Sequence, residues 1–201
     1  MTLDKESLER TEKPLEALTS ELEVFRDHLP EDLRLTPRNL RDKANSAHFT
    51  GFVMLHTHWY LAHCDLYRMV VPNIRDSVSE EVLAATPAQY IVGCQEKCVD
   101  SALALLKFWS ETYRLDTGKL IDDTTLAICA YQCAQILQNL AHLIKRPDKY
   151  TYLREKMCET LPLLTKLRDS FPIVKDFVRT TRRDLNQTQL TCMFRSLIPS
   201  G

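Results

Sequence analysis

Two pairs of cysteines have the spacing that places both members on one face of a helix. Cys94 and Cys98 are four residues apart, and so are Cys129 and Cys133. Four thiolates from two neighbouring helices are a ligand set that zinc accepts. Structural zinc sites, however, usually take their cysteines from loops bounded by turn residues, whereas these four lie in apolar helical stripes. The pattern therefore predicts cysteines that pack in the core, and no metal site.

A second group of potential ligands comprises His56, His58, His63 and Cys64. His56 and His63 are separated by two helical turns, or about 10 Å along one face. One metal ion cannot bridge that distance without a ligand from another element, and His58 points to a different side of the helix. We therefore expect buried or half-buried histidines. A role in pH sensing is an alternative that nothing else in the sequence supports.

The acidic pair Asp122–Asp123 is the last group with chemical potential. A metal-binding motif of the terpene-synthase kind would need a further acidic residue where the chain has Leu126. Carboxylates at a helix N-terminus explain the pair better. The sequence also lacks a glycine-flanked serine nucleophile and closely spaced glycines for a phosphate loop. We expect no catalytic residue, no metal and no cofactor in this chain, and no residue can be assigned to cofactor binding.

The elements that must hold these residues are helices. The chain has 201 residues, of which 44% are hydrophobic and 26% charged, and only 4 are glycine. This composition suits a globular domain, and the scarcity of glycine disfavours hairpin-rich β-structures. No segment alternates with period two. We predict an all-α fold, a single domain of about six helices packed as an irregular bundle over residues 1–183, followed by a tail at 184–201.

The first predicted helix has its firm start near Pro14, a residue suited to a first helical turn. It carries a heptad stripe that we expect to pack on the domain, with a short zipper as the alternative. The stripe consists of Leu8, Leu15, Leu22 and Leu29, with Leu18 and Phe25 between them.

The second predicted helix runs from an N-cap at Asn45 or Ser46 to Val71 and is apolar on two sides, so it should be central. We expect Phe52, Trp59 and Leu66 to be buried in it. Ser79 should cap a short helical turn. The remaining helices are expected at about 88–113, 123–144, 149–169 and 172–183. The helix at 149–169 should kink or stop early at Pro162.

The net charge of −1 gives no global signal for nucleic acid. Residues 141–201 nevertheless hold 12 Lys and Arg against 6 Asp and Glu, which we interpret mainly as a solvated basic helix face. No apolar run is long enough for a membrane span, and residues 1–13 lack the apolar core of a signal peptide. With seven cysteines, an odd number, the chain is expected in a reducing intracellular compartment.

One segment resembles a known family. In residues 23–72, an L-P-x-x-L loop precedes a long helix with the pattern F-x-x-L-H-x-x-Y/W-x-x-x-x-x-x-L-x-R, which ends in a proline turn. This arrangement resembles the middle homology region of fungal-specific transcription factors over about residues 15–170. The matching residues are Leu29, Pro30, Leu33, Phe52, Leu55, His56, Trp59 or Tyr60, Leu66, Arg68 and Pro72.

The resemblance implies a regulatory and interaction domain that modulates transcription by RNA polymerase II in the nucleus. It implies protein partners or self-association, an unidentified small-molecule effector, and contact with DNA only indirectly or through a missing module. The family's six-cysteine zinc cluster needs C-x-x-C pairs, which this sequence lacks. The first part of the region is expected before residue 15 and is missing here. The alternatives are a helical interaction scaffold unrelated to transcription and, less favoured, an all-α enzyme.

Overall fold

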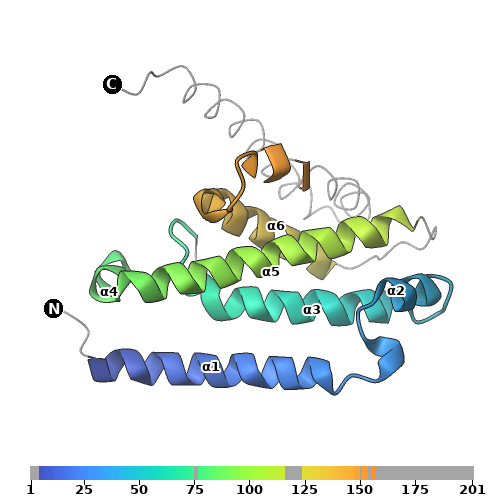
Figure 1. Ribbon diagram of the computed structural model, residues 1–201, viewed down its shortest axis with the longest axis horizontal. Coiled ribbons are helices and arrows are strands. Elements are labelled where there is room, and N and C mark those ends of the chain that lie inside the picture. Colours follow the sequence, from blue (N-terminus) through green and yellow to red (C-terminus); the bar gives the residue numbers. More distant parts are fainter. Residues whose placement is uncertain (1–4, 75–76, 116–123, 150, 154, 157–201) are drawn as a thin grey trace.

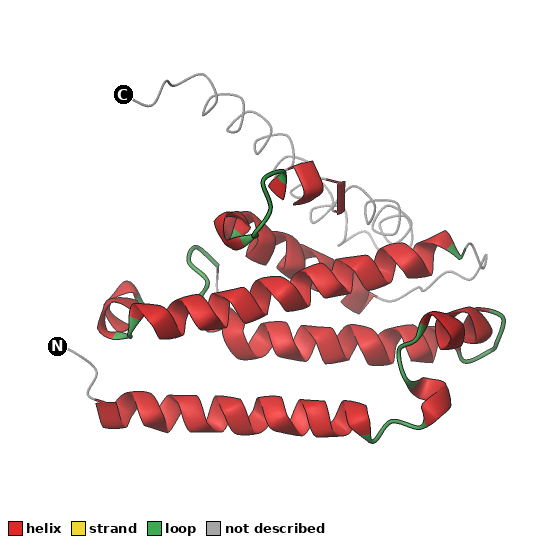
Figure 2. Ribbon diagram, viewed as in Figure 1, coloured by secondary structure: helices red, strands yellow, loops and turns green. Residues whose placement is uncertain are grey.

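The computed structural model describes residues 5–74, 77–115, 124–149, 151–153 and 155–156. Within these ranges every regular element is a helix (Figure 2), which confirms the all-α prediction. In chain order the elements are α1 (Lys5–Asp27), the 3₁₀ turn η1 (Glu31–Leu33), α2 (Pro37–Ala44), α3 (Phe49–Tyr67), the 3₁₀ turn η2 (Arg68–Val70), α4 (Glu80–Ala85), α5 (Ala88–Arg114), α6 (Thr124–Asn139) and the 3₁₀ turn η3 (Ala141–Leu143).

The helix α3 lies at the centre of the arrangement. It contacts α1, α2, α5 and α6, and Figure 1 shows it between α1 on one side and α5 on the other. The helix α6 packs against α5 and also reaches α3. The prediction that the second helix is central is therefore confirmed. By contrast, α1 lies along the outer edge and meets the rest of the described domain mainly through α3.

The core is concentrated between α3, α5 and α6. Phe49 and Val53 from α3, Trp109 from α5 and Leu137 from α6 are each at most 2% exposed. The indole Nε1 of Trp109 donates a hydrogen bond to Thr57 Oγ1 at 3.0 Å, so both buried polar groups are satisfied. Burial of apolar surface in this layer is the main stabilising term of the fold.

The prediction of three buried residues on α3 is correct for Phe52 and wrong for Trp59 and Leu66. Phe52 is 2% exposed, whereas Trp59 and Leu66 are half-buried. In the described part of the chain, the neighbour of α3 at Trp59 is α1, and Trp59 Nε1 donates a hydrogen bond to the Leu22 carbonyl oxygen at 3.1 Å. A helix with one peripheral neighbour on a face leaves that face partly open to solvent.

The predicted polar loop before α3 contains a helix that the sequence analysis missed. Thr36 is the N-cap of α2, its Oγ1 accepting a hydrogen bond from the Asn39 backbone N–H at 3.0 Å, and Pro37 occupies the first turn. The predicted N-cap at Asn45 is instead the C-cap of α2. The next helix begins at Phe49 and ends at Tyr67, where the backbone tightens into η2.

The other boundaries agree to different degrees. The prediction for α5 is correct to within one residue, and Ser79 caps α4 as expected, with Oγ accepting from the Val82 N–H. The first helix extends back to Lys5, so Pro14 lies inside it and the expected start near Pro14 is wrong. The helix α6 ends at Asn139, before η3. The predicted helix at 172–183, most of the one at 149–169 with Pro162, and the tail at 184–201 lie outside the described residues.

The heptad stripe of α1 divides between two environments. Leu15 and Leu22 are half-buried and Leu29, just after the helix, is buried, so this part packs on the domain as predicted. Leu18 and Phe25 are each 47% exposed. The helix α1 therefore leaves apolar side chains partly open to solvent.

Candidate functional site

A histidine of α3 ties the loop that follows α1 to the helical body. His56 is 4% exposed, and its Nε2 lies 3.0 Å from the Leu33 carbonyl oxygen in η1. A carbonyl oxygen only accepts hydrogen bonds, so Nε2 carries the proton. Burial lowers the pKa of His56, with an opposing effect from the bond to Leu33, so the ring is neutral at pH 7.

Arg34 holds the same loop against the end of α1. Its Nε donates to the Leu29 carbonyl oxygen and its Nη2 to the Asp27 carbonyl oxygen, both at 3.1 Å. These bonds satisfy carbonyl groups at and just beyond the C-terminus of α1, where such groups lack helical partners. Asn39 adds bonds to the carbonyl oxygens of Glu31 and Arg34. Segment 28–36 is thereby fixed by the side chain of Arg34, which lies within it, and by the side chain of Asn39 from α2.

The contact between α1 and α3 is largely polar. Besides the bond from Trp59 to α1, Thr19 Oγ1 lies 2.6 Å from Tyr67 Oη, and the Arg26 guanidinium lies over the Trp59 ring at 5.4 Å from its centroid. None of the side chains from residue 13 to residue 27 is buried. The joint thus depends on a few directional contacts and on limited apolar packing.

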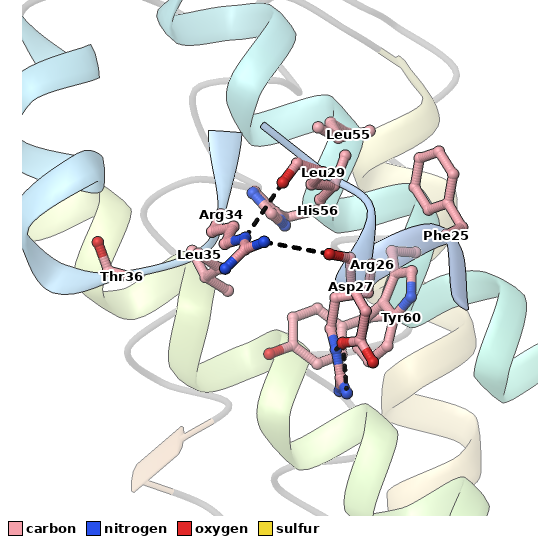
Figure 3. A pocket seen from close by; sticks show the side chains of 11 residues that line it. Phe25, Arg26, Asp27, Leu29, Arg34, Leu35, Thr36, Leu55, His56 and Tyr60 are labelled. Carbon is pink, nitrogen blue, oxygen red and sulfur yellow. Dashed lines mark hydrogen bonds and ion pairs between the residues drawn. The ribbon is translucent and has the colours of Figure 1, made fainter. Parts of the chain in front are cut away.

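A cleft of about 550 Å³ opens between the end of α1, the loop and α3 (Figure 3). This volume lies in the range of small-molecule sites, roughly 300–1,000 Å³. Apolar and aromatic side chains make up most of the lining, and charged groups come from α1 and the loop. The lining residues are Phe25, Arg26, Asp27, Leu29, Arg34, Leu35, Thr36, Leu55, His56, Trp59 and Tyr60.

Some of the residues that carry the family resemblance line this cleft, whereas Pro30, Leu33, Phe52, Leu66, Arg68 and Pro72 do not. Leu29 comes from the loop, and Leu55, His56, Trp59 and Tyr60 come from α3. The sequence analysis identified Phe25 only as part of the heptad stripe, and it missed Arg26, Asp27, Arg34, Leu35 and Thr36. The cue that was available is the capping pattern around Thr36 and Pro37, which places a helix start, and therefore a chain reversal, directly after the loop.

The cysteines singled out in the sequence are core residues, as predicted. Cys98, Cys129 and Cys133 are fully buried, and Cys94 is 5% exposed. Cys64, also fully buried, joins them: its Sγ contacts the Cys98 carbonyl oxygen, and the Cys98 Sγ contacts the Cys64 carbonyl oxygen at 3.7 Å. These contacts link α3 to α5.

The environment of Cys64 and Cys98 keeps these two thiols protonated. Interaction with the Cys133 thiol, together with burial, raises the pKa of Cys64, and interaction with the Cys64 thiol, together with burial, raises that of Cys98. The thiolate is the form that attacks electrophiles and binds metals. Within the described ranges, no three or more His, Cys, Asp or Glu side chains are arranged to hold a metal ion.

The three histidines do not converge on one site. His58 is exposed on another side of α3, whereas His56 and His63 are buried. His63 packs on the Trp59 ring at 4.3 Å between centroids, and its Nε2 lies 3.5 Å from Glu23 Oε1 without forming a hydrogen bond. Burial lowers the pKa of His63, Glu23 opposes this effect, and Arg26 adds to it. Asp122 and Asp123 lie outside the described residues.

Comparison of the chain with models of protein families, with curated proteins and with solved structures gives no match. The resemblance to the fungal regulatory region therefore rests on the motif residues alone. Of the helices in the described part of the chain, none combines the length and the apolar character that crossing a membrane requires.

Proposed function

We propose that this chain is a regulatory domain of the fungal zinc-cluster transcription factor type, acting in the nucleus on transcription by RNA polymerase II. In this proposal the cleft between α1 and α3 receives an effector, and another polypeptide segment supplies the DNA-binding module. The chain itself contributes no zinc cluster, because its sequence has no C-x-x-C pair.

The observation that carries the proposal is the meeting of the two halves of the motif. The loop half and the helix half are joined by the bond between His56 and the Leu33 carbonyl oxygen. Together they line one cleft of small-molecule size. A motif whose residues served only the core would be expected in the layer between α3, α5 and α6. Phe52 does lie in the core, but Leu29, Leu55, His56, Trp59 and Tyr60 line an open cleft.

A helical interaction scaffold is the second candidate, and the exposed apolar side chains of α1 favour it. Leu18, Val24 and Phe25 are each between 47% and 53% exposed. Exposed apolar side chains close together on one helix are a common feature of protein-binding surfaces. A scaffold of this kind would bind a partner without any effect on transcription.

A reporter assay tests the proposal. The full chain, fused to an unrelated DNA-binding module in a fungal cell, should change transcription from a matching promoter relative to the module alone. Leu55→Asp, which places a charge in the cleft, should abolish that change, while Arg38→Gln on the exposed surface of α2 should preserve it. An unaltered transcript level with a folded, nuclear fusion protein would exclude the regulatory role and leave the scaffold.

A further inference from the structure

We infer that the cleft binds a small aromatic monocarboxylate, and that the bound molecule holds α1 against α3. This inference rests on the proposed function, whose effector it identifies by chemical class. The charged group that would recognise the carboxylate is Arg34. The surfaces that would hold the ring are the side chains of Leu55 and Tyr60 (Figure 3), together with that of Trp59.

The charge of Arg34 is the first argument. Of the two arginines that line the cleft, Arg26 is neutralised, because its guanidinium lies 2.5 Å from Glu23 Oε2 and 3.3 Å from Asp27 Oδ1. Arg34 donates only to backbone carbonyl oxygens, and no carboxylate in the described part of the chain forms an ion pair with it. A guanidinium pairs with a carboxylate through two parallel N–H groups, so Arg34 offers an uncompensated anion site.

The lining gives the second argument, which concerns the body of the ligand. Leu29, Leu35 and Leu55 supply apolar surface, and Trp59 and Tyr60 supply aromatic surface, with their two rings in edge contact at 4.9 Å between centroids. Aromatic ligands gain from stacking as well as from burial on such surfaces. A volume of about 550 Å³ accommodates one or two fused rings with a carboxylate.

The charges of the lining limit the charge of the ligand to one. The carboxylate of Asp27 offsets Arg26, so the cleft offers the single uncompensated positive charge of Arg34. His56 is neutral at pH 7, because burial lowers its pKa, and it offers no second positive charge. The cleft therefore favours a monoanion over a dicarboxylate or a phosphate ester.

The position of the cleft links binding to the placement of α1. Its walls come from α1 through Phe25 and Arg26, from the loop through Leu35, and from α3 through Trp59 and Tyr60. A molecule that contacts both helices binds only while α1 is docked, so binding stabilises the docked state by mass action. The few polar contacts between these helices make α1 the element whose position such a ligand can control.

Isothermal titration of the full chain tests the binding step. The probes are 2-naphthoate and its neutral isostere 2-naphthamide. We expect 2-naphthoate to bind roughly tenfold or more tightly than the amide, as a charge-assisted hydrogen bond predicts. Arg34→Gln should remove this preference and Arg34→Lys should restore part of it. Arg38→Gln, an exposed arginine paired with Asp42 on α2, should leave both affinities unchanged.

Hydrogen exchange tests the placement step. Addition of 2-naphthoate should slow exchange of the amides in residues 15–27, and the amide isostere should not. Equal binding of the two probes overturns the carboxylate inference, as does the absence of 2-naphthoate binding in the wild type. The comparison of 2-naphthoate with 2-naphthamide uses the wild-type chain, so its result is valid even if Arg34→Gln unfolds the loop. Binding without slower exchange in α1 overturns the docking step.

The two proposals fail in different experiments. If 2-naphthoate binds as expected but the fusion protein does not change reporter transcription, the regulatory function is wrong and the binding site stands. If the fusion protein regulates the reporter but the preference for the carboxylate is absent, the inference on the ligand is wrong and the regulatory function stands.

Discussion

The two tryptophans of this chain have opposite environments, although both lie on central helices. Trp109 is 1% exposed, and its indole N–H is bonded to Thr57 inside the core. Trp59 is half-buried against α1, with the Arg26 guanidinium over its ring. An aromatic ring contributes to stability in proportion to the surface that it buries, so the two residues should differ in energetic weight.

We expect Trp109→Ala to reduce the free energy of unfolding by about 3–5 kcal/mol, the usual range for a fully buried aromatic residue. Trp59→Ala should cost roughly half as much, because solvent already reaches part of the ring. Urea unfolding followed by far-ultraviolet circular dichroism measures both values. A larger loss in Trp59→Ala than in Trp109→Ala would contradict the placement of the core between α3, α5 and α6.

The buried histidines predict a loss of stability on mild acidification. Burial lowers the folded-state pKa of His56 and of His63 below 6.5. As the pH falls through that value, the unfolded chain therefore binds more protons than the folded chain does. The stabilising contribution of the neutral rings is present above about pH 6.5 and is lost as the pH approaches the folded-state pKa values. Around His63, Glu23 opposes this trend and Arg26 reinforces it.

Thermal unfolding midpoints measured between about pH 7 and pH 5 test this prediction, a window in which histidine is the main titrating side chain. The wild-type midpoint should fall across the window, and His63→Gln should flatten the slope. His58→Gln is the matched control, since His58 is exposed on the same helix, and it should retain the wild-type slope. A midpoint that rises on acidification would contradict the direction of both pKa shifts.

At the scale of elements, α1 is held less firmly than α3 or α5. Its residues from 13 to 27 include no buried side chain, whereas α5 contributes a continuous buried series from Cys94 to Thr112. Local opening costs least where few apolar contacts must be broken. We therefore expect α1 to open while α3 and α5 remain folded.

Native-state hydrogen exchange should show faster exchange in residues 15–27 than in α3 or α5. Trp59→Phe, which removes the bond to the Leu22 carbonyl oxygen, should speed exchange in α1 further and leave α5 unchanged. Tyr113→Phe is a suitable control, because Tyr113 is 38% exposed on α5, away from α1. Uniform exchange across the three helices would indicate that α1 opens only with the whole domain.

The success of the sequence analysis also varied by element. The helix α5 was predicted to within one residue because one apolar stripe extends along its length, and the burial of its cysteines followed from the same stripe. The helix α2 was missed because its eight residues bury only Leu40 and Ala44, too few for a recognisable period. The cleft depends on tertiary contacts such as the one between Arg34 and α1, and no sequence spacing encodes these.

At the scale of the whole molecule, charge bears on the question of DNA. The sequence analysis found a surplus of basic residues in 141–201. Where the structure describes this part, the charges are partly compensated: Lys145 Nζ lies 2.8 Å from Glu96 Oε1, and Arg146 Nε lies 3.0 Å from Asp148 Oδ1. Arg179, Arg182 and Arg183 lie outside the described residues. Paired cations give up an ion pair when they bind phosphate, so they add little to DNA affinity.

We therefore expect the isolated chain to bind duplex DNA weakly at low salt and not at about 0.15 M salt, because phosphate contacts of this kind release few counterions. A gel-shift titration with two duplexes of different sequence at both salt concentrations measures this. Any binding at low salt should be equal for the two duplexes, since base-edge recognition needs a helix or strand placed in a groove. Lys145→Gln with Arg146→Gln should change it little, because both charges are already paired. Tight binding at 0.15 M that discriminates between the duplexes would show that this chain reads DNA itself, and a separate DNA-binding module would then be unnecessary.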